Sequence, residues 1–216
     1  MNLLVQLFLF SLSFRTVRAE SELWLNTSVR YKPIKPVKIE ATQYLRYDEN
    51  ISLRKNTMQQ IEMKYAPIPW GQMMIGYRYI SERSKSGDFE PAHRFMGEFE
   101  LEQNIKNIEV SYRLRYQEEH EPDDLDFQPL IRNKVNLKIK TSTRYAPIVS
   151  AELFTDPMGN VLNNTQYRVC LGTRIKITKH HRINVRGIYE VELDGDLDRA
   201  QIISIAYQYR VPKPQK

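Results

Sequence analysis

The sequence has a single cysteine in 216 residues, which excludes an intramolecular disulfide framework and any metal site built from several cysteines. It has no apolar run of about 20 residues, so it is not a bundle of transmembrane helices. After residue 20 it also lacks the sustained i, i+3, i+4, i+7 apolar spacing of amphipathic helices. Aromatic residues are plentiful, with 13 Tyr, 8 Phe and 2 Trp, and they exclude a disordered chain. The length suits one domain of ordinary size.

The N-terminus has the pattern of a secretory signal peptide. Residues 3–12 are almost entirely apolar, yet they are too few to span a bilayer. Val17-Arg18-Ala19 resembles a small-x-small cleavage site, so we predict a signal peptide over residues 1–19. The alternative is a buried first strand or helix. The formal net charge is +6, and two arginines fall within the predicted signal, so the exported chain is only mildly basic and no nucleic-acid partner is expected.

Beyond residue 36 the dominant hydrophobic period is two, the period of β-strands. One face of the alternating segments carries no charged residue, while about half of the positions on the opposite face are Lys, Arg or Glu. The ten alternating segments are Val37–Tyr47, Gln59–Tyr65, Met73–Tyr79, Phe95–Leu101, Ile108–Tyr116, Val135–Thr141, Val149–Leu153, Tyr167–Ile177, Ile183–Val191 and Gln201–Tyr209. We predict a strand for each of them.

Short and long connectors alternate along the chain, as in an up-and-down antiparallel meander. We therefore predict an all-β, antiparallel, up-and-down transmembrane β-barrel of about ten strands, within a range of 10–12, over residues 37–211. The ten strands would begin and end on the side of the short turns. Leu23–Tyr31 also alternates but has the wrong parity for an eleventh antiparallel strand. Residues 20–36 are therefore left as an N-terminal segment or an extra strand, and residues 212–216 as a C-terminal tail.

Alternation alone does not distinguish a barrel in lipid from a sheet in water, where the apolar face points inward. Lipid is favoured because the chain is predicted to be exported and because tyrosines of the apolar face lie at strand ends, as in interfacial aromatic girdles. Closure into a barrel would also remove the exposed edges of a large sheet. We predict location in the cell outer membrane, with outer-membrane lipid and, during insertion, the barrel-assembly machinery as partners. A soluble sandwich or lipocalin-like carrier is the alternative.

Several short motifs resemble a known family. They are Leu45-Arg46-Tyr47, Gly76-Tyr77-Arg78-Tyr79, His93-Arg94, Arg113-Leu114-Arg115-Tyr116, Arg132-Asn133-Lys134, Glu152-Leu153-Phe154, and Arg168 with Gly172. In order and spacing the chain resembles domain-of-unknown-function family 2490 over roughly residues 22–210. The resemblance implies a Gram-negative outer-membrane barrel with no established activity.

The charged face would line the barrel interior. The lumen-lining candidates are Arg46, Arg78, Arg94, Glu98, Glu100, Arg113, Arg115, Lys138, Glu152, Arg168, Arg174 and Arg186. A polar lumen that prefers anions is one interpretation. A salt-bridged interior that fills the barrel is favoured, because ten strands enclose little more space than the eight that side chains fill.

Candidates for chemistry are few. His93 with Ser111 could form a hydrolase or acyltransferase pair, but no Ser-His-acid spacing supports it. The adjacent His180 and His181 are poorly placed to share a metal, and the acidic segments 123–126 and 194–198 are expected to be solvated loops rather than Ca²⁺ sites. We expect no catalytic residue, metal or cofactor. The predicted function is that of a structural or accessory envelope protein, with a narrow channel, an outer-membrane lipid-modifying enzyme and a soluble periplasmic carrier as alternatives.

Overall fold

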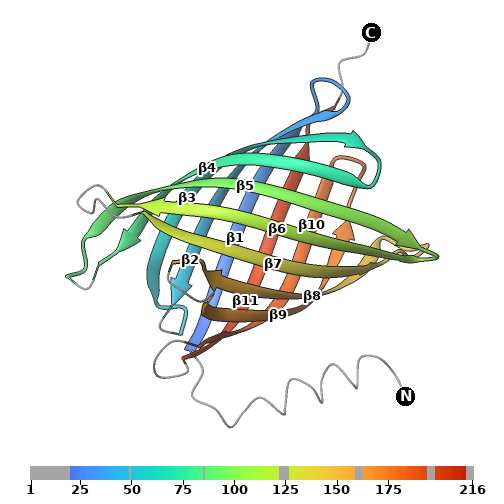
Figure 1. Ribbon diagram of the computed structural model, residues 1–216. Coiled ribbons are helices and arrows are strands. Elements are labelled where there is room, and N and C mark those ends of the chain that lie inside the picture. The colour runs from blue at the N-terminus through green and yellow to red at the C-terminus, as the bar shows by residue number, and fades with distance from the viewer. Residues whose placement is uncertain are drawn as a thin grey trace.

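The alternating segments form the strands of a closed β-barrel, seen in Figure 1. The computed structural model describes residues 20–48, 50–84, 86–121, 127–158, 163–193 and 198–212. This part of the chain contains eleven strands: β1 (Glu20–Tyr31), β2 (Val37–Asp48), β3 (Leu53–Ile68), β4 (Gly71–Arg83), β5 (Phe89–Ile105), β6 (Ile108–His120), β7 (Gln128–Ile139), β8 (Tyr145–Asp156), β9 (Asn163–Lys176), β10 (His181–Glu192) and β11 (Arg199–Arg210). Among these residues no helix is long and apolar enough to cross a membrane.

Each strand pairs in antiparallel fashion with the next along the chain, from β1 through β11. The barrel closes differently, because β1 pairs with β11 in parallel, from Glu20 opposite Ala200 to Arg30 opposite Arg210. The prediction of an antiparallel barrel of 10–12 strands is confirmed. Within residues 20–36, for which the sequence left an N-terminal segment or an extra strand open, the structure has β1 over Glu20–Tyr31. The parity objection fails because it assumed that every neighbouring pair is antiparallel.

The parallel pair places the start of β1 and the end of β11 at opposite ends of the barrel. We call the end that holds connections 49–52, 84–88, 121–127, 157–162 and 193–198 the loop rim. The other end, with connections 32–36, 69–70, 106–107, 140–144 and 177–180, is the turn rim. β1 begins at the loop rim and β11 ends at the turn rim (Figure 1). The expectation that the strands begin and end on one side holds for β2–β11 but not for the whole barrel.

Most strands extend past the predicted segments. β5, for example, runs over Phe89–Ile105, whereas alternation is clear only over Phe95–Leu101. The connections at the loop rim are therefore shorter than predicted, since flanking residues without clean alternation still pair across the sheet. Where two opposite faces do not differ in environment, no alternation is required for a strand to form.

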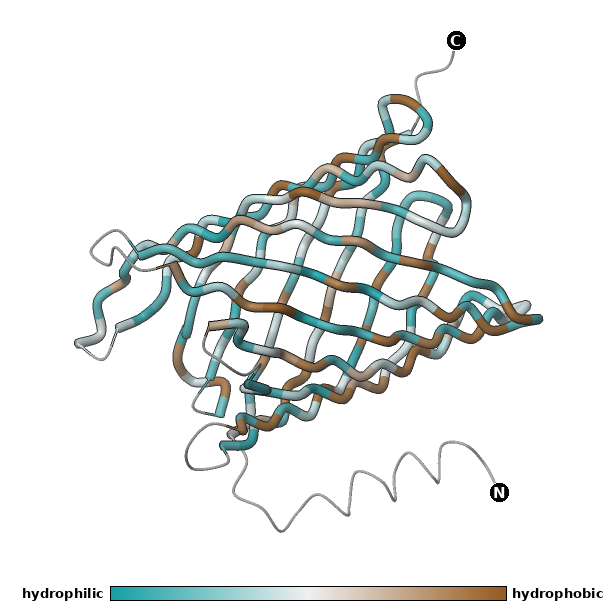
Figure 2. The backbone as a smooth tube through the Cα atoms, in the orientation of Figure 1, coloured by the Kyte–Doolittle hydropathy of each residue, from teal (hydrophilic) through white to brown (hydrophobic). Residues whose placement is uncertain are grey.

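The faces of the barrel are the reverse of those of a soluble protein. Apolar side chains lie on the outside, including Ile75 (63% exposed) and Phe95 (55%), while Glu98 (8%) and Glu152 (5%) lie inside. Figure 2 shows hydrophobic and hydrophilic residues alternating along the strands. A small apolar cluster inside, made by Met58, Ile80 and Ala92 with Tyr44 against it, is the exception to the polar lumen.

Candidate functional site

The lumen is the candidate site, and all twelve predicted lumen-lining residues occur on the inner face of their strands. Cross-strand register brings several of them together. Glu98 of β5 lies opposite Arg115 of β6, and Glu100 lies opposite Arg113. Side chains alternate between the two faces of a strand, so the inner face of each strand is shared by residues two positions apart.

A charged network occupies the wall of β5–β8. Glu152 accepts hydrogen bonds from Arg113 (Nη2 to Oε1, 2.6 Å), Arg132 (Nη2 to Oε1, 2.8 Å) and Lys134 (Nζ to Oε2, 3.2 Å). Glu98 accepts two from Arg115, at 2.8 Å from Nε and 2.6 Å from Nη2. Arg113 joins the two carboxylates, since its Nε lies 3.6 Å from Glu98 Oε2. Every buried carboxylate here is therefore surrounded by cations.

Three further ion pairs cross neighbouring strands. Arg94 pairs with Glu119, Lys138 with Glu109, and Arg168 with Glu190. Glu100, also a predicted lumen residue, accepts a hydrogen bond from Gln72 instead of from a cation. These pairs satisfy charges that would be costly to bury alone.

Aromatic rings fill the lumen in the half nearer the loop rim. Trp24 has the guanidinium of Arg46 over it at 4.0 Å and that of Arg168 at 5.1 Å. Phe154 lies 4.4 Å from Arg168 and 4.6 Å from Arg132. Cation–π contacts of this kind strengthen when they are shielded from water.

Arg78 has a comparable setting beside the apolar cluster. Its guanidinium lies 4.7 Å from the ring of Tyr44 and donates to Gln60 Oε1 from Nε (2.8 Å) and Nη2 (2.5 Å). Gln60 in turn donates to Glu62 at 2.6 Å. The arginines of this half are thus stacked on rings or hydrogen-bonded to buried amides and carboxylates, so they fill space as well as carry charge.

A different arrangement occurs near the turn rim on β9, β10, β11 and β1. The inner face there carries five arginines, Arg30, Arg174, Arg182, Arg186 and Arg210, which we call the arginine sector. Arg174 donates to Asn184 (3.0 Å) and is repelled by Arg182, Arg186 and Arg30. Neither Arg182 nor Arg186 has a carboxylate partner among the described residues, and the Nε of each is buried without a hydrogen-bond partner. The predicted candidates Arg174 and Arg186 belong to this sector.

The residues considered for chemistry do not converge. His93 bonds the hydroxyl of Tyr77 on the outer face (2.7 Å), whereas Ser111 is buried in the lumen, so the two lie on opposite sides of the wall. His181 bonds Tyr207 (2.6 Å), and His180 contacts the carbonyl of Arg210 (2.9 Å). Among the described residues no cluster of His, Cys, Asp or Glu is arranged to hold a metal. The acidic segment 123–126 and the first four residues of the segment 194–198 lie outside those residues.

Several residues of the lumen were missed because they lie just beyond the predicted segments. Arg132 and Lys134 precede Val135, and Phe154 follows Leu153. In the same way, Arg182 precedes the predicted segment Ile183–Val191, and Arg210 follows the predicted segment Gln201–Tyr209. The signal was present, since the alternation of polar residues Arg132, Lys134, Asn136 and Lys138 begins upstream of the apolar alternation. Trp24 and Arg30 belong to β1, whose alternation does not reveal its place in the barrel.

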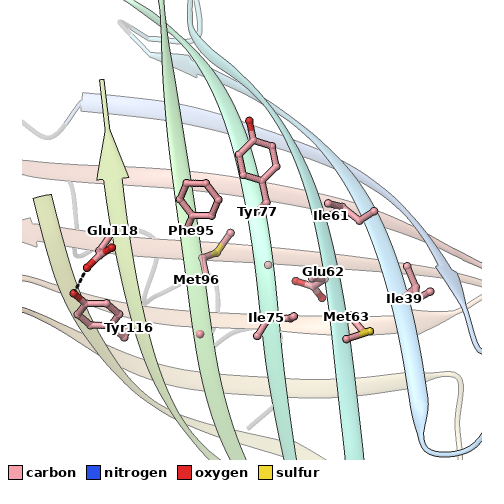
Figure 3. A pocket seen from close by; sticks show the side chains of 12 residues that line it. Ile39, Ile61, Glu62, Met63, Ile75, Tyr77, Phe95, Met96, Tyr116 and Glu118 are labelled. Atoms are coloured by element: carbon pink, nitrogen blue, oxygen red, sulfur yellow. Dashed lines mark hydrogen bonds between the residues drawn. The ribbon is translucent and has the colours of Figure 1, made fainter. Parts of the chain in front are cut away.

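The outer wall has a shallow apolar depression of about 580 Å³ over β2–β6, shown in Figure 3. Its lining includes Ile61, Ile75 and Phe95, and the inner-face residue Glu62 is among the side chains seen at its base. Gly97 helps to open it, because a Cβ there would meet no atom within 4 Å. The depression faces away from the lumen and therefore has no part in the charged site.

Fold and site together define a closed, mostly antiparallel β-barrel with an apolar exterior and a charged lumen. A family model described as protein of unknown function (DUF2490) matches residues 21–200, and the chain belongs to that family. No curated protein matches the sequence.

Proposed function

We propose that this protein is an outer-membrane β-barrel with a side-chain-filled lumen, acting as a structural or accessory envelope protein and not as an enzyme. The observation that carries the proposal is the inversion of the two faces. Large apolar side chains such as Ile75, Phe95 and Ile203 are more than half exposed outside, while buried glutamates and arginines lie within. In water this arrangement would lose the hydrophobic stabilisation that folding requires; in lipid it is the expected one.

Aromatic residues on the outer wall support the same location. Tyr116 is 45% exposed toward the loop rim, and Tyr65 (45%) and Trp70 (54%) lie at the turn rim. Amphipathic rings of this kind favour the interface between lipid and water. The predicted signal peptide over residues 1–19 supplies the route of export, although it lies outside the described residues.

The alternatives are less well supported. A soluble carrier of the lipocalin kind needs an apolar interior, whereas this lumen is lined by Glu98, Arg115, Glu152 and similar side chains. The lipid-modifying enzyme would need a nucleophile and a base together, and Ser111 and His93 lie on opposite faces. A narrow channel remains the second candidate because of the arginine sector, and conductance distinguishes it from a filled barrel.

Thiol labelling on whole cells tests both location and orientation. We expect the loop rim to face outward and the turn rim to face the periplasm. Ser86→Cys at the loop rim should therefore react with a membrane-impermeant reagent on intact cells. Asn107→Cys, in a turn-rim connection, should react only after the outer membrane is permeabilised. The sole native cysteine, Cys170, is buried and provides a low background.

The outcomes of that experiment differ sharply. The reverse labelling pattern would reject the orientation, and equal labelling of both positions on intact cells would reject a barrier between the rims. Recovery of the folded protein in the soluble periplasmic fraction, without detergent, would reject the membrane location altogether.

The filled lumen predicts little or no conductance in planar bilayers. The paired side chains of Glu98, Glu152, Arg113 and Arg115 lie inside the barrel at mid-depth, and their mutual neutralisation favours an interior that they fill. A large, stable, anion-selective conductance that falls in Arg113→Glu but not in Arg144→Glu would contradict the proposal. Arg144 is the control because it carries the same charge in an exposed connection at the turn rim.

A further inference from the structure

The arginine sector is distributed over four adjacent strands of one side of the wall. Arg174 of β9, Arg182 and Arg186 of β10, Arg210 of β11 and Arg30 of β1 all point inward. Four of the five lie within three residues of the turn-rim end of their strands. The sector therefore borders the mouth of the lumen, where a solute arriving from that side meets it first.

Few negative charges face these arginines. Glu40 accepts from Arg30 (2.7 Å) and from Gln208 (2.8 Å). Glu109 attracts Arg174 electrostatically, but it forms an ion pair with Lys138. Within the described part of the chain, the side-chain acceptors of Arg174 and Arg210 are the neutral amides of Asn184 (3.0 Å) and Gln208 (3.3 Å). The sector thus keeps a surplus of positive charge that its own carboxylates do not neutralise.

This surplus sets the sector apart from the remaining lumen cations. Arg46 also has a buried Nε without a hydrogen-bond partner, but its guanidinium lies over Trp24. Arg182 and Arg186 have neither a carboxylate nor an aromatic partner among the residues described here. Partly buried like charges that repel one another lower stability, and such arrangements are typical of sites that bind an opposite charge.

Gly172 is part of the same arrangement. It lies opposite Arg186 in the β9–β10 register, and a Cβ at this position would come 2.8 Å from Arg186 Cγ and 2.4 Å from the carbonyl oxygen of Val185. The absence of a side chain at position 172 lets the stem of Arg186 lie close against the wall. The backbone thus provides the space that holds this arginine in place.

We infer that the arginine sector binds a phosphate-type oxyanion that enters from the turn rim, either as a free anion or as the headgroup of a lipid. Guanidinium groups suit this ligand because their planar donors match the oxygens of phosphate two at a time. The buried Nε atoms of Arg182 and Arg186 supply donors that no protein group satisfies. The inference concerns the lumen itself and does not depend on the membrane location.

Calorimetric titration of the purified protein tests the inference. In a non-ionic detergent, at constant ionic strength set by chloride, inorganic phosphate should bind saturably. The double variant Arg174→Gln/Arg182→Gln should weaken binding by about tenfold or more, since it removes two of the charged donors of the sector. Arg144→Gln, with one charge removed from an exposed connection at the same rim, should bind as the wild type does.

Two further arms keep the result interpretable. Arg182→Lys retains the charge but not the planar fork, so it should bind phosphate with intermediate affinity, and it serves if the double variant does not fold. Short-chain phosphatidylglycerol below its micelle concentration, compared with neutral phosphatidylcholine, separates the two sources of the ligand. Displacement of phosphate by the anionic lipid alone would indicate a headgroup site, and no displacement a site for a free anion.

Absence of saturable binding of both phosphate and phosphatidylglycerol would overturn the inference. So would equal binding by the wild type and a folded double variant, because the arginines would then not be the ligands. Folding of each variant is checked by its different electrophoretic mobility before and after heating. A negative result here would leave the conductance and labelling experiments unaffected, and their failure would not remove a measured anion site.

Discussion

The wall of β5–β8 and the wall of β9–β11 with β1 hold buried arginines in contrasting ways. On β5–β8 the carboxylates of Glu98 and Glu152 lie between guanidinium and ammonium groups from neighbouring strands. In the arginine sector Arg174 is repelled by Arg182, Arg186 and Arg30. Glu40 accepts hydrogen bonds from Arg30 and Gln208. In the first wall the cations are paired with carboxylates of the protein and need no ligand. In the second wall some guanidinium donors have no acceptor among the described residues. Charge balance therefore separates a part of the lumen that maintains the fold from a part suited to binding.

The largest effect should come from removing the central carboxylate of the balanced wall. Glu152→Ala leaves Arg113, Arg132 and Lys134 without their common counter-charge, and breaking a buried ion pair in this way costs about 3–5 kcal/mol. Denaturant unfolding of the protein in detergent would measure the loss. Glu90→Ala, at an exposed position of β5, is the matched control and should change stability by no more than about 0.5 kcal/mol. A small effect of Glu152→Ala would mean that the two walls do not differ.

A much smaller effect, of opposite sign or near zero, is expected in the arginine sector. Arg182→Gln removes a charge that repels Arg30 and Arg174 and that has no carboxylate partner among the described residues. The unfolding free energy without phosphate should be unchanged or higher by up to about 1 kcal/mol, as is common when a site is optimised for binding and not for stability. The same unfolding measurement checks it. A loss comparable to that of Glu152→Ala would indicate that Arg182 has a structural partner.

Sequence reasoning was sufficient for ten of the eleven described strands, because alternation reports environment directly. Arg113 and Arg115, for instance, could be placed inside and opposite Glu98 and Glu100 from the hairpin alone. The network around Glu152 was missed, because Arg132 and Lys134 lie where the outer face is polar at Asn133, which bonds Tyr112 (2.7 Å). That single polar position ended the apolar alternation early.

The arginine sector was out of reach for another reason. Arg30, Arg174 and Arg210 are far apart in the sequence, and only the closure of β1 on β11 brings Arg30 beside Arg210. The way the barrel closes depends on the direction in which β1 runs. The alternation of apolar and polar residues within β1 does not indicate that direction. The face of a strand on which a residue lies follows from the residues beside it in the sequence. Which residues lie side by side where β1 meets β11 depends on the fold of the whole chain.

The parallel pairing of β1 with β11 also has a consequence for how the barrel forms. The ten other pairings join consecutive strands and can form as local hairpins, while Glu20 meets Ala200 only across almost the whole chain. Closing so long a loop is slow compared with forming a hairpin. The order of assembly should therefore be a growing curved sheet first and closure last. Until closure, the free edges of β1 and β11 would each expose unpaired backbone groups, and they are the edges that a folding factor would have to protect.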